Sequence, residues 1–117
     1  MNPKGYVVVQ EEDVQIRELL ERWLREAGYL VAASGAALET APTLVIANVA
    51  EPHAAAGLIR SLKGVYAAPI LALSARFRRG LAGSVEAARR LGVKKVLPKP
   101  FTRSELLAAV RAAVEGA

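Results

Sequence analysis

Short continuous apolar runs alternate along this chain with segments whose apolar residues recur at helical spacing. The runs extend from Tyr6 to Gln10, Tyr29 to Ala33, Leu44 to Asn48, Ile70 to Ser74 and Lys95 to Leu97. Such runs predict strands that are buried on both faces, as in a parallel sheet whose crossovers are helices. The alternation therefore predicts an α/β fold, a three-layer, doubly wound, five-stranded parallel sheet in the order 2-1-3-4-5.

Helices are predicted between these strands and after the last one. The strongest pattern is formed by Ile16, Leu19, Leu20, Trp23 and Ala27, and Gly28 supplies its stop. Weaker helical patterns extend over Ala36 to Ala41, about Ala54 to Lys63, and about Gly80 to Leu91. The final helix follows Thr102-Arg103-Ser104-Glu105, which has the form of a capping box, and its buried stripe is predicted at Leu106, Leu107, Val110 and Val114.

The composition narrows the function classes. The 117 residues contain no linker or repeat, which predicts a single domain over residues 1–117. Cysteine is absent, so a disulfide framework, a thiol nucleophile and a thiolate metal site are excluded. Neither a secretion signal nor an apolar stretch long enough to cross a bilayer is present, which favours a cytoplasmic protein without membrane contact. The net charge of +5 favours an acidic partner.

Polar side chains stand where four of the predicted strands end. Glu11 and Glu12 follow the first strand, Asn48 closes the third, Ser74 closes the fourth, and Lys99 comes after the fifth. Because the carboxyl ends of parallel strands meet at one edge of the sheet, these side chains are expected to share one crevice.

The order and spacing of four segments resemble the receiver domain of two-component response regulators. The segments are Val7 to Asp13, Pro42 to Asn48, Pro69 to Ala75, and Lys99-Pro100-Phe101. The resemblance implies a flavodoxin-like receiver fold in which a histidine kinase phosphorylates an aspartate at the end of the third strand. It also implies that an acidic pair holds Mg²⁺, that a hydroxyl and a lysine contact the phosphoryl group, and that the lysine-proline bond is cis. Glu11 and Glu12 match the acidic pair, Ser74 the hydroxyl and Lys99 the lysine.

The position of the phosphoacceptor is occupied by Asn48, whose amide oxygen is neutral and cannot form the usual acyl phosphate. The chain is therefore expected to be a degenerate pseudo-receiver, not an enzyme, with Lys99 paired to an acidic residue or to Asn48. No cofactor is expected, although weak binding of Mg²⁺ by Glu11 and Glu12 is an alternative. The resemblance further implies an aromatic switch residue in the fifth strand, where this chain has Val96.

Because both the phosphoacceptor and the aromatic residue are replaced, the protein is expected to act by binding a partner. The predicted binding surface is formed by the helix near Gly80 to Leu91, the fifth strand and the last helix. The residues predicted for this surface are Arg76, Phe77, Arg89, Arg90, Lys94, Lys95, Val96, Arg103 and Arg111. Phe77 is interpreted as an exposed aromatic anchor among arginines. The favoured occupant is an acidic protein surface, and a second copy of the chain is also considered. Two alternatives are phosphorylation through an atypical group and, less favoured, nucleic-acid binding by the basic residues.

Overall fold

The computed structural model describes residues 4–33, 35, 40–78 and 80–115. It contains the predicted five-stranded parallel sheet in the order β2-β1-β3-β4-β5. The strands are β1 (Tyr6–Gln10), β2 (Leu30–Ala33), β3 (Leu44–Asn48), β4 (Ile70–Ser74) and β5 (Lys95–Pro98). β1, β3 and β4 have the predicted bounds, and those of β2 and β5 differ from the prediction by one residue.

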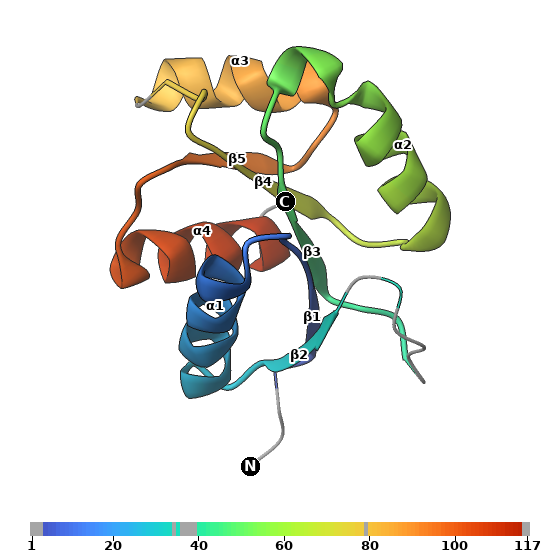
Figure 1. Cartoon of the computed structure of the whole chain (residues 1–117), viewed down its shortest axis with the longest axis vertical. Helices are drawn as coiled ribbons and strands as arrows, with labels where there is room; N and C mark the ends of the chain where they lie inside the picture. The colour runs from blue at the N-terminus through green and yellow to red at the C-terminus, as the bar shows by residue number, and fades with distance from the viewer. Residues whose placement is uncertain (1–3, 34, 36–39, 79, 116–117) are drawn as a thin grey trace.

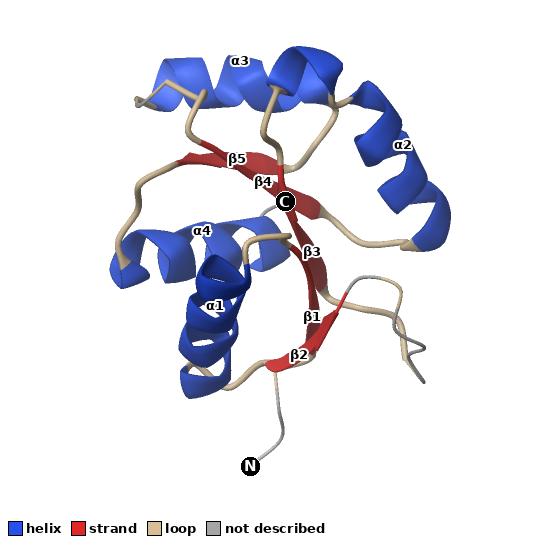
Figure 2. Ribbon diagram, viewed as in Figure 1, coloured by secondary structure: helices blue, strands red, loops and turns tan. Residues whose placement is uncertain are grey.

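Two helical layers cover the sheet. The helices are α1 (Val14–Glu26), α2 (Ala56–Val65), α3 (Leu81–Leu91) and α4 (Arg103–Glu115), and a short 3₁₀ helix, η1 (Pro52–Ala54), precedes α2. α1 and α4 pack on one face, whereas α2 and α3 pack on the other (Figure 1). The strands form the middle layer between them (Figure 2).

Alternate residues of the strands belong to two separate hydrophobic cores, one on each face of the sheet. Val7 and Val9 of β1 point toward α1 and α4, where they meet Leu20, Leu24 and Leu106. Val8 points to the other face and joins a cluster that includes residues of α2 and α3. Because the central strands are buried on both faces, they carry the unbroken apolar runs that predicted a parallel sheet.

The predicted helix starts and stops are largely confirmed. The Thr102 Oγ1 atom accepts the Glu105 N–H at 3.1 Å, and a Glu105 carboxylate oxygen accepts the Thr102 N–H at 2.9 Å, which completes the capping box. α1 ends before Gly28, which has a φ of 99° that favours glycine.

Two helix predictions need correction. The segment predicted as one helix over Ala54 to Lys63 is divided into η1 and α2, because Pro52 starts a tight turn that ends at Ala55. The helix predicted over Ala36 to Ala41 falls mainly on residues 36–39, which lie outside the described residues, and Thr40 and Ala41 are not helical.

The last helix buries smaller residues than the sequence pattern predicts. Leu106 and Val110 are buried as expected, but Leu107 and Val114 are half-buried. Ala109 and Ala113 complete the buried face. Small side chains at these positions allow the helix backbone to approach the sheet closely.

Candidate functional site

The strand register brings the predicted polar side chains to the carboxyl edge of the sheet. Gln10 pairs with Ala47, so Glu11 and Asn48 come next to each other on adjacent strands. Asn48 pairs with Leu73, and Ser74 pairs with Pro98, which is followed by Lys99. The register therefore brings Glu11, Asn48, Ser74 and Lys99 to the same edge of the sheet, as predicted from the strand ends.

Lys99 is the central contact of this site. Its Nζ atom donates hydrogen bonds to Asn48 Oδ1 at 2.7 Å and to Glu11 Oε2 at 3.2 Å. The Glu11 side chain is 3% exposed and that of Lys99 is 19% exposed, so the ion pair is largely withdrawn from water. The pairing predicted for Lys99 is confirmed, and it gives two of the three ammonium N–H groups a partner within the protein. The Lys99-Pro100 peptide bond is cis, as the resemblance implied.

The start of α1 fixes the orientation of Glu11. Glu11 Oε1 accepts the Asp13 N–H at 3.1 Å, and Arg17 donates to the Glu11 main-chain oxygen at 3.3 Å. Asp13 in turn caps α1 by accepting the N–H groups of Gln15 and Ile16. The carboxylate of Glu11 is consequently held toward Lys99 by the same turn that begins the helix.

Glu12 is placed differently from Glu11. Its side chain is exposed, and among the described residues it has no hydrogen bond or ion pair. Within this part of the chain, no three His, Cys, Asp or Glu side chains gather as a metal-binding group. These groups fit Mg²⁺ poorly, because this ion prefers several hard, charged oxygens. The Glu11 carboxylate is paired with Lys99, the Glu12 carboxylate is exposed, and the Asn48 amide is neutral.

Ser74 is buried at the end of β4, with 1% of its surface exposed. Its hydroxyl oxygen accepts the Arg76 N–H at 3.0 Å, which stabilises the turn after the strand. The hydroxyl is thus positioned by the backbone at the same edge as Asn48 and Lys99.

Two residues predicted for the partner surface are buried, so their assignment to it is wrong. Phe77 is 8% exposed and packs in the core beneath α2 and α3, because the turn after Ser74 folds its ring inward. Val96 is 2% exposed and belongs to the same core. Neither side chain can serve as an exposed anchor.

Arg89, Arg90 and Arg103 of the predicted partner surface lie on α3 and α4, the helices on either side of β5 in the chain. Arg89 and Arg90 are exposed on α3, and both pair with Glu86, at 3.7 and 3.2 Å. Arg103, on α4, pairs with Glu26 of α1 at 3.5 Å. Because α3 and α4 cover opposite faces of the sheet (Figure 1), these arginines lie on helices of opposite faces.

The remaining basic residues of this surface differ in exposure. Lys94 and Arg111 are exposed, and Lys95 is half-buried. Arg76 lies in the loop after β4 and pairs with Glu51 at 3.6 Å. Arg76 and Arg90 also line a groove of about 800 Å³ between η1, this loop and α3, whose lining is partly apolar.

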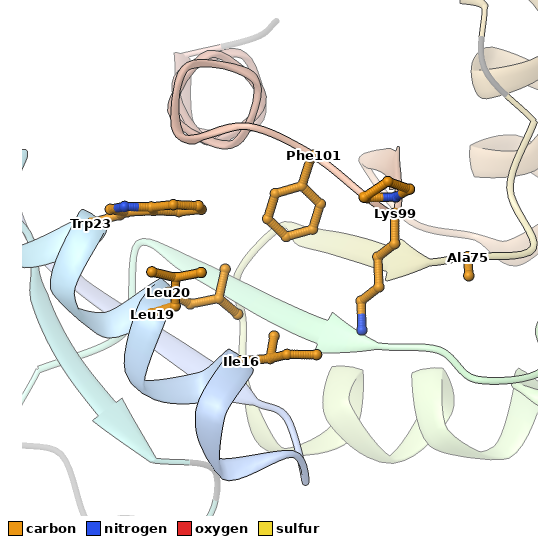
Figure 3. A pocket seen from close by; sticks show the side chains of 8 residues that line it. Ile16, Leu19, Leu20, Trp23, Ala75, Lys99 and Phe101 are labelled. Atoms are coloured by element: carbon orange, nitrogen blue, oxygen red, sulfur yellow. The ribbon is translucent and has the colours of Figure 1, made fainter.

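An apolar groove beside Lys99 was not predicted from the sequence. It has a volume of about 390 Å³ and lies between α1 and the loop that precedes α4. The residues that line it are Ile16, Leu19, Leu20, Trp23, Ala75, Lys99, Pro100 and Phe101 (Figure 3). Trp23 and Phe101 meet edge to face with their ring centroids 6.4 Å apart. Trp23 belongs to the predicted apolar stripe of α1, and its half-buried indole packs against the core and forms one side of this groove.

The sheet order and the polar site at its carboxyl edge define a receiver fold of the response-regulator type. A response regulator receiver protein from Burkholderia phymatum is similar with a TM-score of 0.72 and 25% identity, over 97% of this chain and 98% of that one. A response regulator from Thermotoga maritima gives a TM-score of 0.73 at 19% identity, over 99% of this chain and all of that one. CheY4 of Vibrio cholerae gives 0.71 at 20% identity, over 93% and 98% of the two chains.

The sequence of this chain is also similar to part of a longer regulatory protein. The transcriptional regulatory protein PdtaR of Mycobacterium tuberculosis, from strains CDC 1551 and H37Rv, is 37% identical over 120 aligned positions. The alignment covers 92% of this chain and 56% of PdtaR, so the chain spans about half the length of these curated relatives. No protein-family model matches the chain. The homologue and the structural neighbours support a receiver domain of two-component signalling.

Among the described residues, no helix has both the length and the apolar composition needed to cross a bilayer.

Proposed function

We propose that this protein is a cytoplasmic, non-enzymatic regulatory module of the two-component type that acts through protein–protein contacts and is not phosphorylated at the usual position. The observation that carries the proposal is the hydrogen bond from Lys99 Nζ to Asn48 Oδ1 at 2.7 Å. In this proposal Asn48 occupies the position of the phosphoacceptor, and the hydrogen bond gives the lysine a partner in the absence of phosphate.

The chemistry of Asn48 supports this proposal. A carboxylate attacks phosphorus with a charged oxygen, whereas an amide oxygen is neutral and weakly nucleophilic. Val96, at the position where the resemblance implies an aromatic switch residue, is buried and has no ring to rotate. In this proposal, both the residue that would accept the phosphoryl group and the aromatic residue that would respond to it are replaced. The surface of the fold then remains as the means of binding a partner.

The favoured partner is a protein with an acidic surface, which would bind along the β5 edge between α3 and α4. Lys94, Arg89 and Arg111 are exposed there. The burial of Phe77 removes the aromatic contact from either kind of partner, so the proposal rests on the exposed basic residues. The name of PdtaR as a transcriptional regulatory protein is compatible with an output in gene expression, but a receiver need not touch nucleic acid to provide it.

The phosphorylation part of the proposal is tested by intact mass after incubation with acetyl phosphate and Mg²⁺. The wild type is expected to gain no stable phosphoryl mass, and Asn48→Asp is expected to gain one, since Ser74 and Lys99 remain beside the new carboxylate. Phosphorylation of the wild type to the same extent as the variant would refute the proposal. Peptide mapping of any wild-type product identifies whether an atypical group, such as the Ser74 hydroxyl, is the acceptor.

The surface part is tested by affinity capture from the source cell with a double charge reversal, Arg89→Glu with Arg90→Glu. A partner that uses the β5 edge should be lost with this variant and retained with Arg22→Glu, which reverses an exposed charge on α1 on the other side of the sheet. Sedimentation of the purified protein tests a second copy as the partner. Association that falls steeply with salt and requires nucleic acid would instead support the nucleic-acid alternative.

A further inference from the structure

The groove between η1, the loop after β4 and α3 combines apolar side chains with several basic ones. Glu11, Asn48, Ser74 and Lys99 do not line it, so it is separate from the polar site. We propose that this η1–α3 groove binds a nucleotide, with arginine side chains on the phosphate groups and the apolar lining against the base. This binding site goes beyond the regulatory role proposed above and does not depend on it.

The size of the groove suits a small molecule. Its volume of about 800 Å³ lies within the range of roughly 300 to 1,000 Å³ that is usual for ligand pockets. η1 and α3 lie on the same side of the sheet and form two of its walls (Figure 1). A Cβ atom added to Gly83 of α3 would meet the Arg78 Cβ atom at 3.7 Å, so the loop lies close to the helix at this end.

The apolar lining comes from every segment around the groove. It consists of Pro52, Ala56, Phe77, Ala87 and Leu91. Phe77 belongs to the hydrophobic core, which fixes this part of the lining in place. An aromatic base that covers these side chains removes apolar area from water, whereas a hydrated anion alone gains nothing from them. The apolar lining therefore favours a ligand that carries a ring system besides its charge.

Arg78 is a basic group without a competing partner. It is exposed, it lines the groove, and among the described residues it makes no hydrogen bond or ion pair. A guanidinium group presents its N–H donors in a planar fork that fits two phosphate oxygens at once. Arg78 is therefore available to a phosphate group without the loss of any contact within this part of the chain.

The other two arginines of the groove are held only by exposed ion pairs. Arg76 is 3.6 Å from Glu51, and their side chains are 66% and 47% exposed. Arg90 is 3.2 Å from Glu86, and that carboxylate is shared with Arg89 at 3.7 Å. Exposed pairs of this kind contribute little to stability, so a phosphate group that binds an arginine through two charge-assisted hydrogen bonds competes well with them.

The charges around the groove also favour an anion. Arg76, Arg78 and Arg90 carry three positive charges, and Glu51 and Glu86 carry two negative ones, which leaves one positive charge in excess. His53 lines the same groove and adds a ring N–H donor. The basic groups and the apolar lining together match the two halves of a nucleotide.

The test is calorimetric titration of the full-length chain with ADP, GDP and UDP in a metal-free buffer. Adenosine and pyrophosphate serve as the two halves of the ligand. At least one nucleotide is expected to bind about tenfold or more tightly than either half, because only the nucleotide reaches both the arginines and the apolar lining. The absence of binding at millimolar concentrations of all three nucleotides would overturn the proposal.

Two other ligands separate the proposed site from simpler ones. If pyrophosphate binds as tightly as the nucleotides, the groove is a site for inorganic anions, and the nucleotide assignment is wrong. If a single-stranded oligonucleotide binds more tightly than any mononucleotide, and its affinity falls steeply with salt, the ligand is nucleic acid, and the small-molecule proposal is overturned.

Arg78→Gln tests the phosphate contact. The loss of charge-assisted hydrogen bonds is expected to lower nucleotide affinity about tenfold or more, while the midpoint of urea unfolding stays unchanged because no contact among the described residues is broken. Arg22→Gln, which removes an exposed arginine from α1 on the other face of the sheet, is the matched control and should bind like the wild type. Equal affinity in Arg78→Gln and Arg22→Gln would overturn the proposal.

Glu51→Gln tests whether the ligand competes for Arg76. This variant releases Arg76 from its ion pair, so nucleotide affinity is expected to rise about two- to fivefold. Glu18→Gln removes an exposed carboxylate from α1 and changes the net charge equally, but it should leave the affinity as it is. An affinity that is unchanged or weaker in Glu51→Gln would overturn the placement of the phosphate groups at Arg76.

Discussion

Replacing Asn48 by aspartate should turn a poor metal site into a usable one, and the expected gain in Mg²⁺ affinity can be worked from the geometry. In the wild type, the crevice contains one buried carboxylate, Glu11, which is already paired with Lys99 at 3.2 Å. Asn48→Asp adds a second carboxylate beside the same lysine without changing the size of the side chain.

Two opposing contributions determine the gain. A carboxylate whose charge is about 4 Å from a divalent cation is attracted by roughly 8 kcal/mol at an effective dielectric constant near 20. The same carboxylate at the 2.7 Å separation now found between Lys99 and Asn48 is attracted to the ammonium group by roughly 6 kcal/mol, which is lost if the metal displaces Lys99. The difference of about 2 kcal/mol corresponds to roughly a 30-fold increase in Mg²⁺ affinity.

Isothermal titration of Mg²⁺ into both proteins measures this difference. Asn48→Asp combined with Glu11→Gln is the control, because it removes one carboxylate for the one gained and should return the affinity close to that of the wild type. A gain of less than about threefold for the single variant would show that Lys99 holds the new carboxylate more strongly than the metal does. The electrostatic reasoning would then be wrong.

Three further outcomes follow from individual contacts. Thr102→Ala removes the N-cap acceptor of α4 and should lower the free energy of unfolding by about 1 kcal/mol, measured by urea titration, whereas an unchanged midpoint would contradict the capping role. Tyr66→Phe removes the hydroxyl that accepts the Gly35 N–H at 2.9 Å, so hydrogen exchange at Gly35 should accelerate, and an equal rate would argue against this bond. Burial, and secondly the Glu115 carboxylate, raise the pKa of Tyr29 above 10.0, so its contribution to stability is complete below pH 10 and is lost as pH rises through the raised pKa. Absorbance titration of the phenolate should show the pKa of Tyr29 falling partway back in Glu115→Gln, and an unchanged pKa would exclude the carboxylate as a cause.

The sequence was sufficient to predict the sheet, because strands buried on both faces must be apolar at every position. The run Leu44–Asn48 shows this most clearly, since its first four residues are buried and only the terminal amide is partly exposed. The polar site was predictable for a related reason. Residues at the carboxyl ends of parallel strands meet whatever their separation in the chain, as Lys99 and Glu11 do across 88 positions.

Features that depend on how a turn or a helix packs could not be predicted from pattern. Phe77 lies among arginines, so its neighbours in sequence indicated exposure, but the turn after Ser74 folds it into the core. The apolar groove depends on the distance between α1 and the loop containing Phe101, and neither segment determines that distance alone. Ala109 and Ala113 were overlooked because hydrophobic strength ranks them below leucine and valine, although their small size is what suits a closely packed helix.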